Sequence, residues 1–217
     1  MSQIIKASVK KSSGKSKRAE ITLILAFSLA VLSCSFTSWS NSLDSIRGRI
    51  LRLHILANSD SGVDQQMKYE IRDRILAYGG KLFYSADLSA DKQKAKNRLA
   101  ESLEPIKQIA QEVIAQYGRN YPIEVTLERK YFNTRSYDEI TLPAGKYDAL
   151  VVRIGKAEGK NWWCVMFPPM CLPAAEERDS QLSRVLDDGE LRIISDDANY
   201  KIKFAIVEAI ESLKNRD

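Results

Sequence analysis

Histidine is almost absent from this sequence, because His54 is the only one among 217 residues. A cysteine hydrolase pairs its thiolate with a histidine base, and a serine triad would depend on the same imidazole. Because His54 is the only histidine, a zinc site around it would lack its usual set of histidine and cysteine ligands. Asn58, Asp60 and Asp64 follow, but their spacing does not match a calcium loop, and turn and helix-cap chemistry explains them. We therefore predict no catalytic or metal-binding residues and no cofactor.

The body of the chain also lacks an excess of positive charge. There are 33 lysine and arginine residues against 28 acidic ones, but six of the basic residues and one acidic residue lie within positions 1–20. The remainder is neutral overall. A protein that binds DNA or RNA by neutralising phosphates needs basic residues clustered on its folded part. Nucleic-acid binding is therefore not predicted.

Charge is missing altogether from residues 21–43. This segment follows the basic stretch and passes from the apolar ITLILAFSLAVLSCSF to the small and polar TSWSNS. That is the order of n-region, h-region and cleavage region in a secretory signal. We predict that residues 1–40 direct export and that residues 41–217 form one extracytoplasmic domain, which meets the membrane only through the N-terminal segment.

The sequence leaves the fate of this leader open. Ser38 and Ser40 are small residues at the two positions that a signal peptidase reads, which favours cleavage near Ser40. Retention as an anchor is the alternative, because the uncharged run to Leu43 could span a bilayer although its strongly apolar part is shorter than about 20 residues. Lipid attachment at Cys34 is a third interpretation, but VLSC resembles a lipobox only loosely.

The domain is expected to begin with a strand and a helix. ILRLHILA, residues 50–57, has the composition of a strand, and NSDSG, residues 58–62, breaks it with turn-forming residues. Ser61 and Asp64 form the pattern of a capping box, so a helix should begin there and end at Gly79-Gly80. Its buried stripe is expected to comprise Met67, Ile71, Ile75 and Leu76.

Beyond this helix the hydrophobic period changes from helix to strand. Residues 92–117 have helical spacing, with Pro105 predicting a kink or two helices. PIEVTLERKYF, ITLPAGKYDALVVRIG and NWWCVMF are typical of strands, and a bend is expected at Pro143-Ala144-Gly145. A shorter element, LRIIS, and a terminal amphipathic helix follow. Because short links favour antiparallel pairing, we predict an α+β fold, with an antiparallel sheet and helices packed on one face.

Three blocks of residues are similar to a known family. LRLHILANSDSGVDQQMKYEIRDRIL, LPAGKYDALVVRIG and GKNWWCVMFPPMC occur in this order after a membrane-directing N-terminus. In order and spacing they resemble the stage II sporulation protein R family of endospore-forming bacteria, over roughly residues 46–172. The resemblance implies a signalling protein and not an enzyme.

The resemblance also implies a place and a partner. Proteins of that family are made in the forespore and exported into the space between the two membranes that separate it from the mother cell. There they trigger the membrane-embedded aspartic protease that cleaves pro-sigma-E in the mother cell. We therefore expect this chain in the intermembrane space, secreted or tethered by an uncleaved anchor, with that protease as its partner.

An enzyme remains the alternative. Paired carboxylates could serve a secreted cell-wall hydrolase or another hydrolase. Carboxylates are too plentiful in this chain to single out one pair.

The stretch GKNWWCVMFPPMC concentrates aromatic, sulfur and proline residues. Outside the cytoplasm Cys164 and Cys171 could form a disulfide, closing a short loop that Pro168-Pro169 stiffens. The alternative is that both thiols are buried and reduced, and that the aromatic side chains are simply core.

A receptor contact is expected near the same stretch. Neighbouring strand residues point to opposite faces, so one of Trp162 and Trp163 should lie in the core and the other should be available to a receptor. Exposed aromatic side chains carry much of the energy of interfaces, which makes Trp162, Trp163 and Phe167 candidate contacts. The turn with Asn58 and Asp60, and the charged face of the first helix, are competing candidates.

Overall fold

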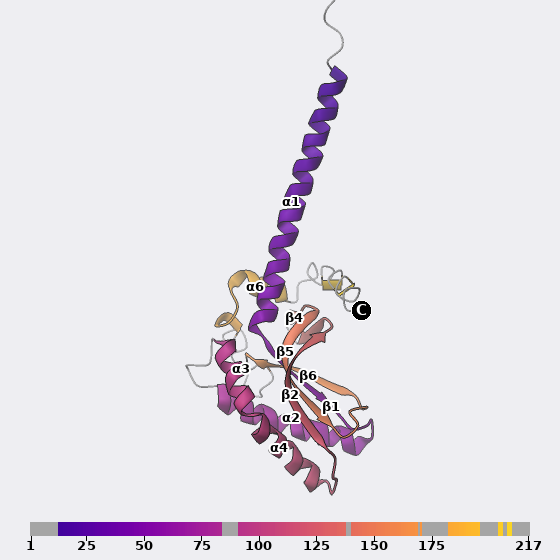
Figure 1. Ribbon diagram of the computed structural model, residues 1–217, viewed down its shortest axis with the longest axis vertical. Coiled ribbons are helices and arrows are strands. Elements are labelled where there is room, and N and C mark those ends of the chain that lie inside the picture. The colour runs from indigo at the N-terminus through magenta and orange to yellow at the C-terminus, as the bar shows by residue number, and fades with distance from the viewer. Residues whose placement is uncertain are drawn as a thin grey trace, which may run out of the picture. The chain divides into compact units, whose positions relative to one another are not determined.

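The computed structural model describes residues 13–83, 91–137, 140–168, 170 and 182–195, together with the short pieces 204–205 and 208–209. The chain divides into two compact units, Met1–Ser42 and Leu43–Asp217. The described part of the first unit belongs to one long helix, and the second unit contains the sheets and the other helices (Figure 1).

Helix α1 (Ser13–Arg49) contains the uncharged segment. Its part from Lys17 to Arg49 is long and apolar enough to cross a membrane. Apolar side chains along it are open to the surroundings, as Phe27 illustrates with 73% exposure. Such a helix is consistent with the predicted export signal or anchor. Cleavage near Ser40 and lipid attachment at Cys34, which is an exposed free thiol, stay predictions.

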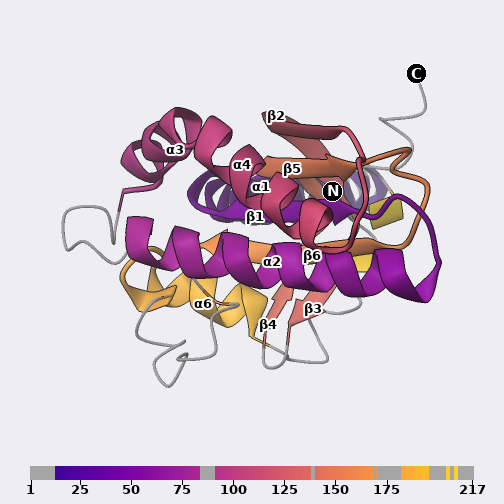
Figure 2. The ribbon, with the colours of Figure 1, turned by 90° about the horizontal axis from the view of Figure 1, so that it is seen from below.

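The second unit is built on a four-stranded sheet in the order β2-β5-β1-β6 (Figure 2). Its strands are β1 (Leu51–Leu56), β2 (Ile123–Phe132), β5 (Gly145–Ile154) and β6 (Asn161–Phe167). The α+β class is confirmed. β1 pairs antiparallel with β6, and β2 with β5, but β1 and β5 run parallel. The sheet is therefore mixed, which corrects the antiparallel prediction for this one pair: three helices separate β1 from β2, so the rule for short links does not apply to β1.

Three helices follow β1, and they are α2 (Gly62–Phe83), α3 (Lys92–Glu101) and α4 (Leu103–Gln116). Helix α2 packs against β1 and β6, and α4 packs against β2 and α2 (Figure 2). The predicted stripe is confirmed, since Met67, Ile71 and Ile75 are fully buried. The helical region divides at Ser102, with Pro105 in the first turn of α4. This confirms the two-helix alternative, because proline is tolerated in a first turn.

Helix α2 does not end at Gly79-Gly80, as the sequence predicted, but continues to Phe83. Gly79 faces the sheet, where an added Cβ would come within 2.8 Å of Met166 Cε on β6. A glycine can mark a close approach between elements as well as a helix end. Here it allows the helix to lie close to β6.

The other face of the sheet meets a small second sheet of β3 (Arg135–Tyr137) and β4 (Ile140–Leu142). Side chains of β3 reach the main sheet: Arg135 lies over the Trp163 ring, and Tyr137 lies beside Arg52. The predicted bend is confirmed, since β4 ends at Leu142 and β5 begins at Gly145.

Helix α6 (Asp188–Ile194) lies beside β4 and begins with a capping box between Asp187 and Glu190. The buried Glu190 carboxylate also lies 3.1 Å from Arg49 at the end of α1. The element LRIIS thus falls mostly within a helix. The expected terminal amphipathic helix lies largely outside the described residues; of its predicted apolar residues Ile202, Ala205, Ile206, Ala209 and Leu213, only Ala205 and Ala209 are described, and both are helical.

Candidate functional site

The turn after β1 is held together by its own side chains. The Asp64 carboxylate accepts hydrogen bonds from Asn58 Nδ2 at 2.8 Å and from Ser59 Oγ at 2.5 Å. Ser61 Oγ accepts from the Asp64 amide at 3.2 Å, which confirms the Ser61 half of the predicted capping box. Burial acts to raise the pKa of Asp64, but the hydrogen bonds from Ser59, Asn58 and Ser61 outweigh it and lower that pKa.

The same turn is bound to the turn between β5 and β6. Asn58 Oδ1 accepts from the Lys156 amide at 3.0 Å, and Asp60 Oδ1 accepts from the Lys160 amide at 2.6 Å. Both side chains are thus engaged within the fold. Asn58 and Asp60 therefore fit a structural role best, while the receptor contact predicted for them remains untested.

Trp162 and Trp163 lie on opposite faces of β6, as strand alternation predicted. In register, Trp162 is opposite Ile55 of β1 and Trp163 is opposite His54. Both indoles are half-buried, so the expected division into one core and one exposed tryptophan is not sharp. Phe167 is fully buried and packs edge-on against Phe83, with centroids 6.0 Å apart. Phe167 therefore belongs to the core and is not part of the contact surface proposed below.

On the helix face, Trp162 meets two side chains of α2. The Tyr69 ring stands edge-on to the indole, with centroids 5.7 Å apart. The guanidinium carbon of Arg72 lies 4.3 Å from the Trp162 ring centre and 5.0 Å from that of Tyr69. Tyr69 is 40% exposed, and Val63 of the same helix is 43% exposed. We call Trp162, Tyr69 and Arg72 the Trp162 cluster; these three residue types are the ones enriched at interface hot spots.

On the opposite face, Trp163 stacks on His54, with centroids 3.7 Å apart and planes within 8° of each other. Phe132 stands edge-on to Trp163 at 5.0 Å. His54 Nε2 lies 3.1 Å from Asn161 Oδ1, whereas Nδ1 is buried and has no hydrogen-bond partner within the described ranges. Burial lowers the pKa of His54 from 6.5 to about 4. The ring is therefore neutral at pH 7 and packs as an aromatic residue.

Arg52 is fully buried on the same face as His54. Its guanidinium carbon lies 4.1 Å from the Phe132 ring centre, 5.0 Å from that of Tyr147 and 5.6 Å from that of Tyr137. Its Nη2 donates a hydrogen bond to the Tyr137 hydroxyl, while Nε and Nη1 have no hydrogen-bond partner in the described part of the chain. Three aromatic rings thus surround a buried cation.

Cys164 is disulfide-bonded in the structure, and Cys34 is a free thiol. Cys171 lies outside the described residues, so its pairing with Cys164 stays a prediction. In the described ranges no three histidine, cysteine, aspartate or glutamate side chains gather closely enough to hold a metal ion.

Alkylation of the unfolded full chain tests the pairing. Without reductant, iodoacetamide is expected to modify Cys34 alone; after reduction it should also modify Cys164 and Cys171. Peptide mass spectrometry distinguishes the three sites. Modification of all three cysteines without reductant would contradict the bond, and Cys171→Ser should expose Cys164 to the reagent.

The family model described as Stage II sporulation protein R matches residues 47–177. The chain belongs to the stage II sporulation protein R family. Stage II sporulation protein R of Bacillus subtilis (strain 168) is 31% identical over 188 residues, which cover 77% of this chain and 83% of that relative. No solved structure matches the chain. The resemblance found in the sequence is confirmed, and membership implies a role in sporulation signalling.

The segment matched by the stage II sporulation protein R family contains both tryptophans and also residues that sequence reasoning missed. Tyr69 and Arg72 are three residues apart in α2, so their shared helix face could have been predicted. Their meeting with Trp162, 90 residues later, could not. Arg52 gave a weak signal as a charged residue in an otherwise apolar strand.

Proposed function

We propose that this chain is an exported sporulation signal that activates the membrane-embedded aspartic protease processing pro-sigma-E in the mother cell. Membership of the stage II sporulation protein R family supports the signalling role. The apolar helix α1 supports export or anchoring, which would put the domain outside the cytoplasm, between the forespore and the mother cell.

The contact surface is the Trp162 cluster, and this is the observation that carries the proposal. Trp162 is half-buried and Tyr69 is 40% exposed, so each ring keeps a part of its apolar surface that a partner can cover. Arg72 lies across both rings and also forms an ion pair with Asp73, with Nη2 and Oδ1 2.7 Å apart, so its guanidinium is held in place before a partner binds. The packing within the cluster also reduces the side-chain entropy lost on binding. Trp163, which is stacked on His54 on the other face, has a packing role.

Activation by contact requires no chemistry from the signal. It binds the active arrangement of the protease more tightly than the inactive one, for example by favouring dimerisation of a half-site aspartic protease. Moving such an equilibrium from 1:99 to 99:1 requires about 10⁴-fold tighter binding to the active form. A hot-spot surface with several such side chains can supply this difference.

Co-expression of the full chain with the protease and its pro-sigma-E substrate in a non-sporulating host tests the proposal, with substrate cleavage read on a blot. Trp162→Ala and Tyr69→Ala should each lower cleavage about tenfold or more at limiting signal, since a hot-spot residue contributes at least about 2 kcal/mol. Trp163→Ala is the matched control, because it removes the neighbouring indole from the opposite face. Resistance of the exported variants to added protease shows that each is folded.

Loss of cleavage with folded Trp163→Ala, but not with Trp162→Ala, would move the contact to the other face. His54→Gln addresses the secreted-hydrolase alternative, since His54 is the sole histidine. A folded His54→Gln variant that still binds the protease but no longer signals would favour an enzyme over a contact signal.

A further inference from the structure

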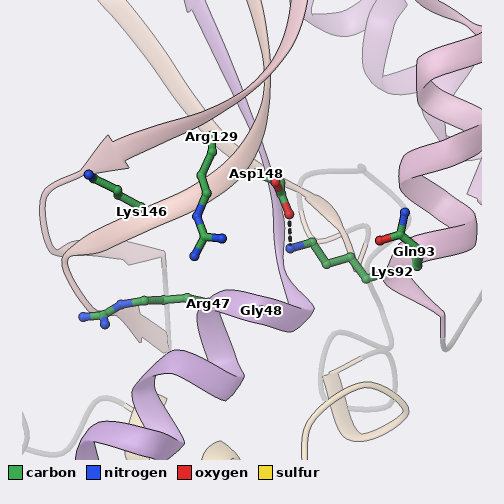
Figure 3. Close-up of a pocket in the computed structure, with 7 residues that line it drawn as sticks. All are labelled: Arg47, Gly48, Lys92, Gln93, Arg129, Lys146 and Asp148. Carbon is green, nitrogen blue, oxygen red and sulfur yellow. Dashed lines mark ion pairs between the residues drawn. The ribbon is translucent and has the colours of Figure 1, made fainter.

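A basic pocket of about 250 Å³ lies where the last turn of α1 meets α3 and two strands (Figure 3). A water molecule occupies about 30 Å³ of liquid, so the pocket has room for a phosphate group and several waters. Asp148 is the one acidic residue among its lining. The lining residues are Arg47, Gly48, Lys92, Gln93, Arg129, Lys146 and Asp148.

Asp148 cannot balance this charge, because two lysines already bind it. Lys92 Nζ lies 2.5 Å from one carboxylate oxygen, and Lys96 Nζ lies 3.0 Å from the other. These lysines keep the carboxylate ionised: burial acts to raise the pKa of Asp148, but Lys92 and Lys96 outweigh it and lower that pKa. The Asp148 carboxylate is therefore neutralised by Lys92 and Lys96 and does not neutralise the other cations of the pocket.

Arg129 and Lys146 are two cations of the pocket that Asp148 does not neutralise. Arg129 is directly opposite Asp148 in the β2–β5 pairing, and Lys146 is two residues before Asp148 on β5, so the three share a face. Neither Arg129 nor Lys146 has an ion pair or a side-chain hydrogen bond within the described residues. Figure 3 shows the Arg129 guanidinium beside the Lys92–Asp148 ion pair, and its charge acts on Lys92.

The position of the pocket along the chain suggests what it meets. The uncharged run of α1 ends at Leu43, and Arg47 follows one helical turn later, about 6 Å farther along the axis. The headgroup zones of a bilayer add about 5–7 Å on each side of the hydrocarbon core. With a retained anchor, Arg47 would therefore follow the membrane-crossing segment closely along the chain.

We propose that this pocket binds a phosphate group. Arg129 recognises it with a bidentate guanidinium, and Lys146, whose ammonium points away from Arg129 in Figure 3, turns toward the same group on binding. An anionic lipid headgroup is one source of the group and free phosphate is another. Retention of α1 favours the first source, because it keeps the domain at a membrane.

The full chain in a neutral detergent tests the site through the midpoint of its thermal unfolding, since a ligand that binds only the folded state raises it. The three probes are inorganic phosphate, dihexanoyl phosphatidylglycerol and dihexanoyl phosphatidylcholine. The double variant Arg129→Gln/Lys146→Gln should weaken binding of the first two about tenfold or more. Arg119→Gln/Lys156→Gln removes the same charge from exposed positions outside the pocket and should bind as the wild type does.

The outcomes separate the two sources. Phosphatidylglycerol binding at least about tenfold tighter than inorganic phosphate assigns the site to a lipid headgroup, and equal affinity assigns it to free phosphate. Asp148→Asn removes the carboxylate of the pocket and should therefore tighten the binding of whichever anion occupies it, phosphatidylglycerol or inorganic phosphate. The proposal is overturned if neither anion raises the midpoint, if phosphatidylcholine acts as strongly as phosphatidylglycerol, or if the Arg119/Lys156 control weakens binding as much as the pocket variant.

Discussion

The free energy of unfolding of residues 41–217 should fall by about 3 kcal/mol between pH 7 and pH 4, because His54 must remain neutral in the fold. Its ring is 2% exposed and stacks on Trp163. Burial is the largest cause that lowers its pKa to about 4; the hydrogen bond with Asn161 opposes it, and the positive charges of Lys130, Arg153 and Arg52 add to it.

The sign follows from the two states of the chain. Between pH 6.5 and about 4 the unfolded state binds a proton at His54 while the folded state does not. Stability from this residue is therefore fully present above pH 6.5 and is lost as the pH falls through this window. Asp64 and Asp148 have pKa values lowered from 3.8, so their contribution is lost only at still lower pH. The loss of stability caused by His54 and the loss caused by the two aspartates therefore occur in different pH ranges.

Urea unfolding of residues 41–217, followed by tryptophan fluorescence at several pH values, measures this dependence. His54→Phe keeps an aromatic ring against Trp163 and removes the titrating group, so its stability should change little between pH 6.5 and 4. If His54→Phe and the wild type lose the same free energy over that range, another group is responsible and His54 is not held neutral.

The sheet illustrates how far the sequence could lead. The stripe of Met67, Ile71 and Ile75 is a local period, and the structure follows it. The strand β2 forms where predicted, but in and out positions alternate only at its start, because residues 125–128 are all half-buried. The parallel pairing of β1 with β5 joins residues almost 100 positions apart. Local patterns specify which face of a strand is buried, but they do not specify which strand lies beside it. The prediction of a wholly antiparallel sheet was wrong for β1 and β5 for this reason.

In the candidate site, too, local patterns predicted some features, and contacts between distant segments could not be predicted. Strand alternation correctly separated Trp162 from Trp163, and turn chemistry explained Asn58 and Asp64. Alternation also puts Arg52 and His54 on one face of β1, where a wet surface would be the ordinary expectation. Instead, side chains of β2, β3 and β5 cover Arg52. Burial that depends on distant segments leaves no period in the sequence.

Arg52→Lys should destabilise the domain more than Arg52→Met does, although lysine keeps the charge. The wild-type guanidinium is planar, and it lies over Phe132, Tyr137 and Tyr147 while donating to the Tyr137 hydroxyl. Cation–π contacts of a desolvated cation are worth up to about 2 kcal/mol each, which offsets much of the cost of burying the charge. An ammonium is more strongly hydrated and cannot face three rings in this way.

Lysine at this position has two unfavourable options. It can remain charged without a carboxylate partner, or it can lose its proton, which at pH 7 costs about 4–5 kcal/mol from an ordinary pKa near 10.4. We therefore expect Arg52→Lys to lower the free energy of unfolding by about 3–5 kcal/mol at pH 7. Methionine fills similar space without charge, so Arg52→Met should lower it by less than about 1.5 kcal/mol.

Urea unfolding of both variants at pH 7 and at pH 10 separates these causes. The deficit of Arg52→Lys should shrink toward pH 10, because the unfolded chain then also begins to lose the lysine proton and the penalty for a neutral amine falls. The deficit of Arg52→Met should not depend on pH in this range. Equal stability of the two variants at pH 7 would mean that water or an anion reaches position 52, and that the aromatic rings are not what holds the Arg52 charge in the core.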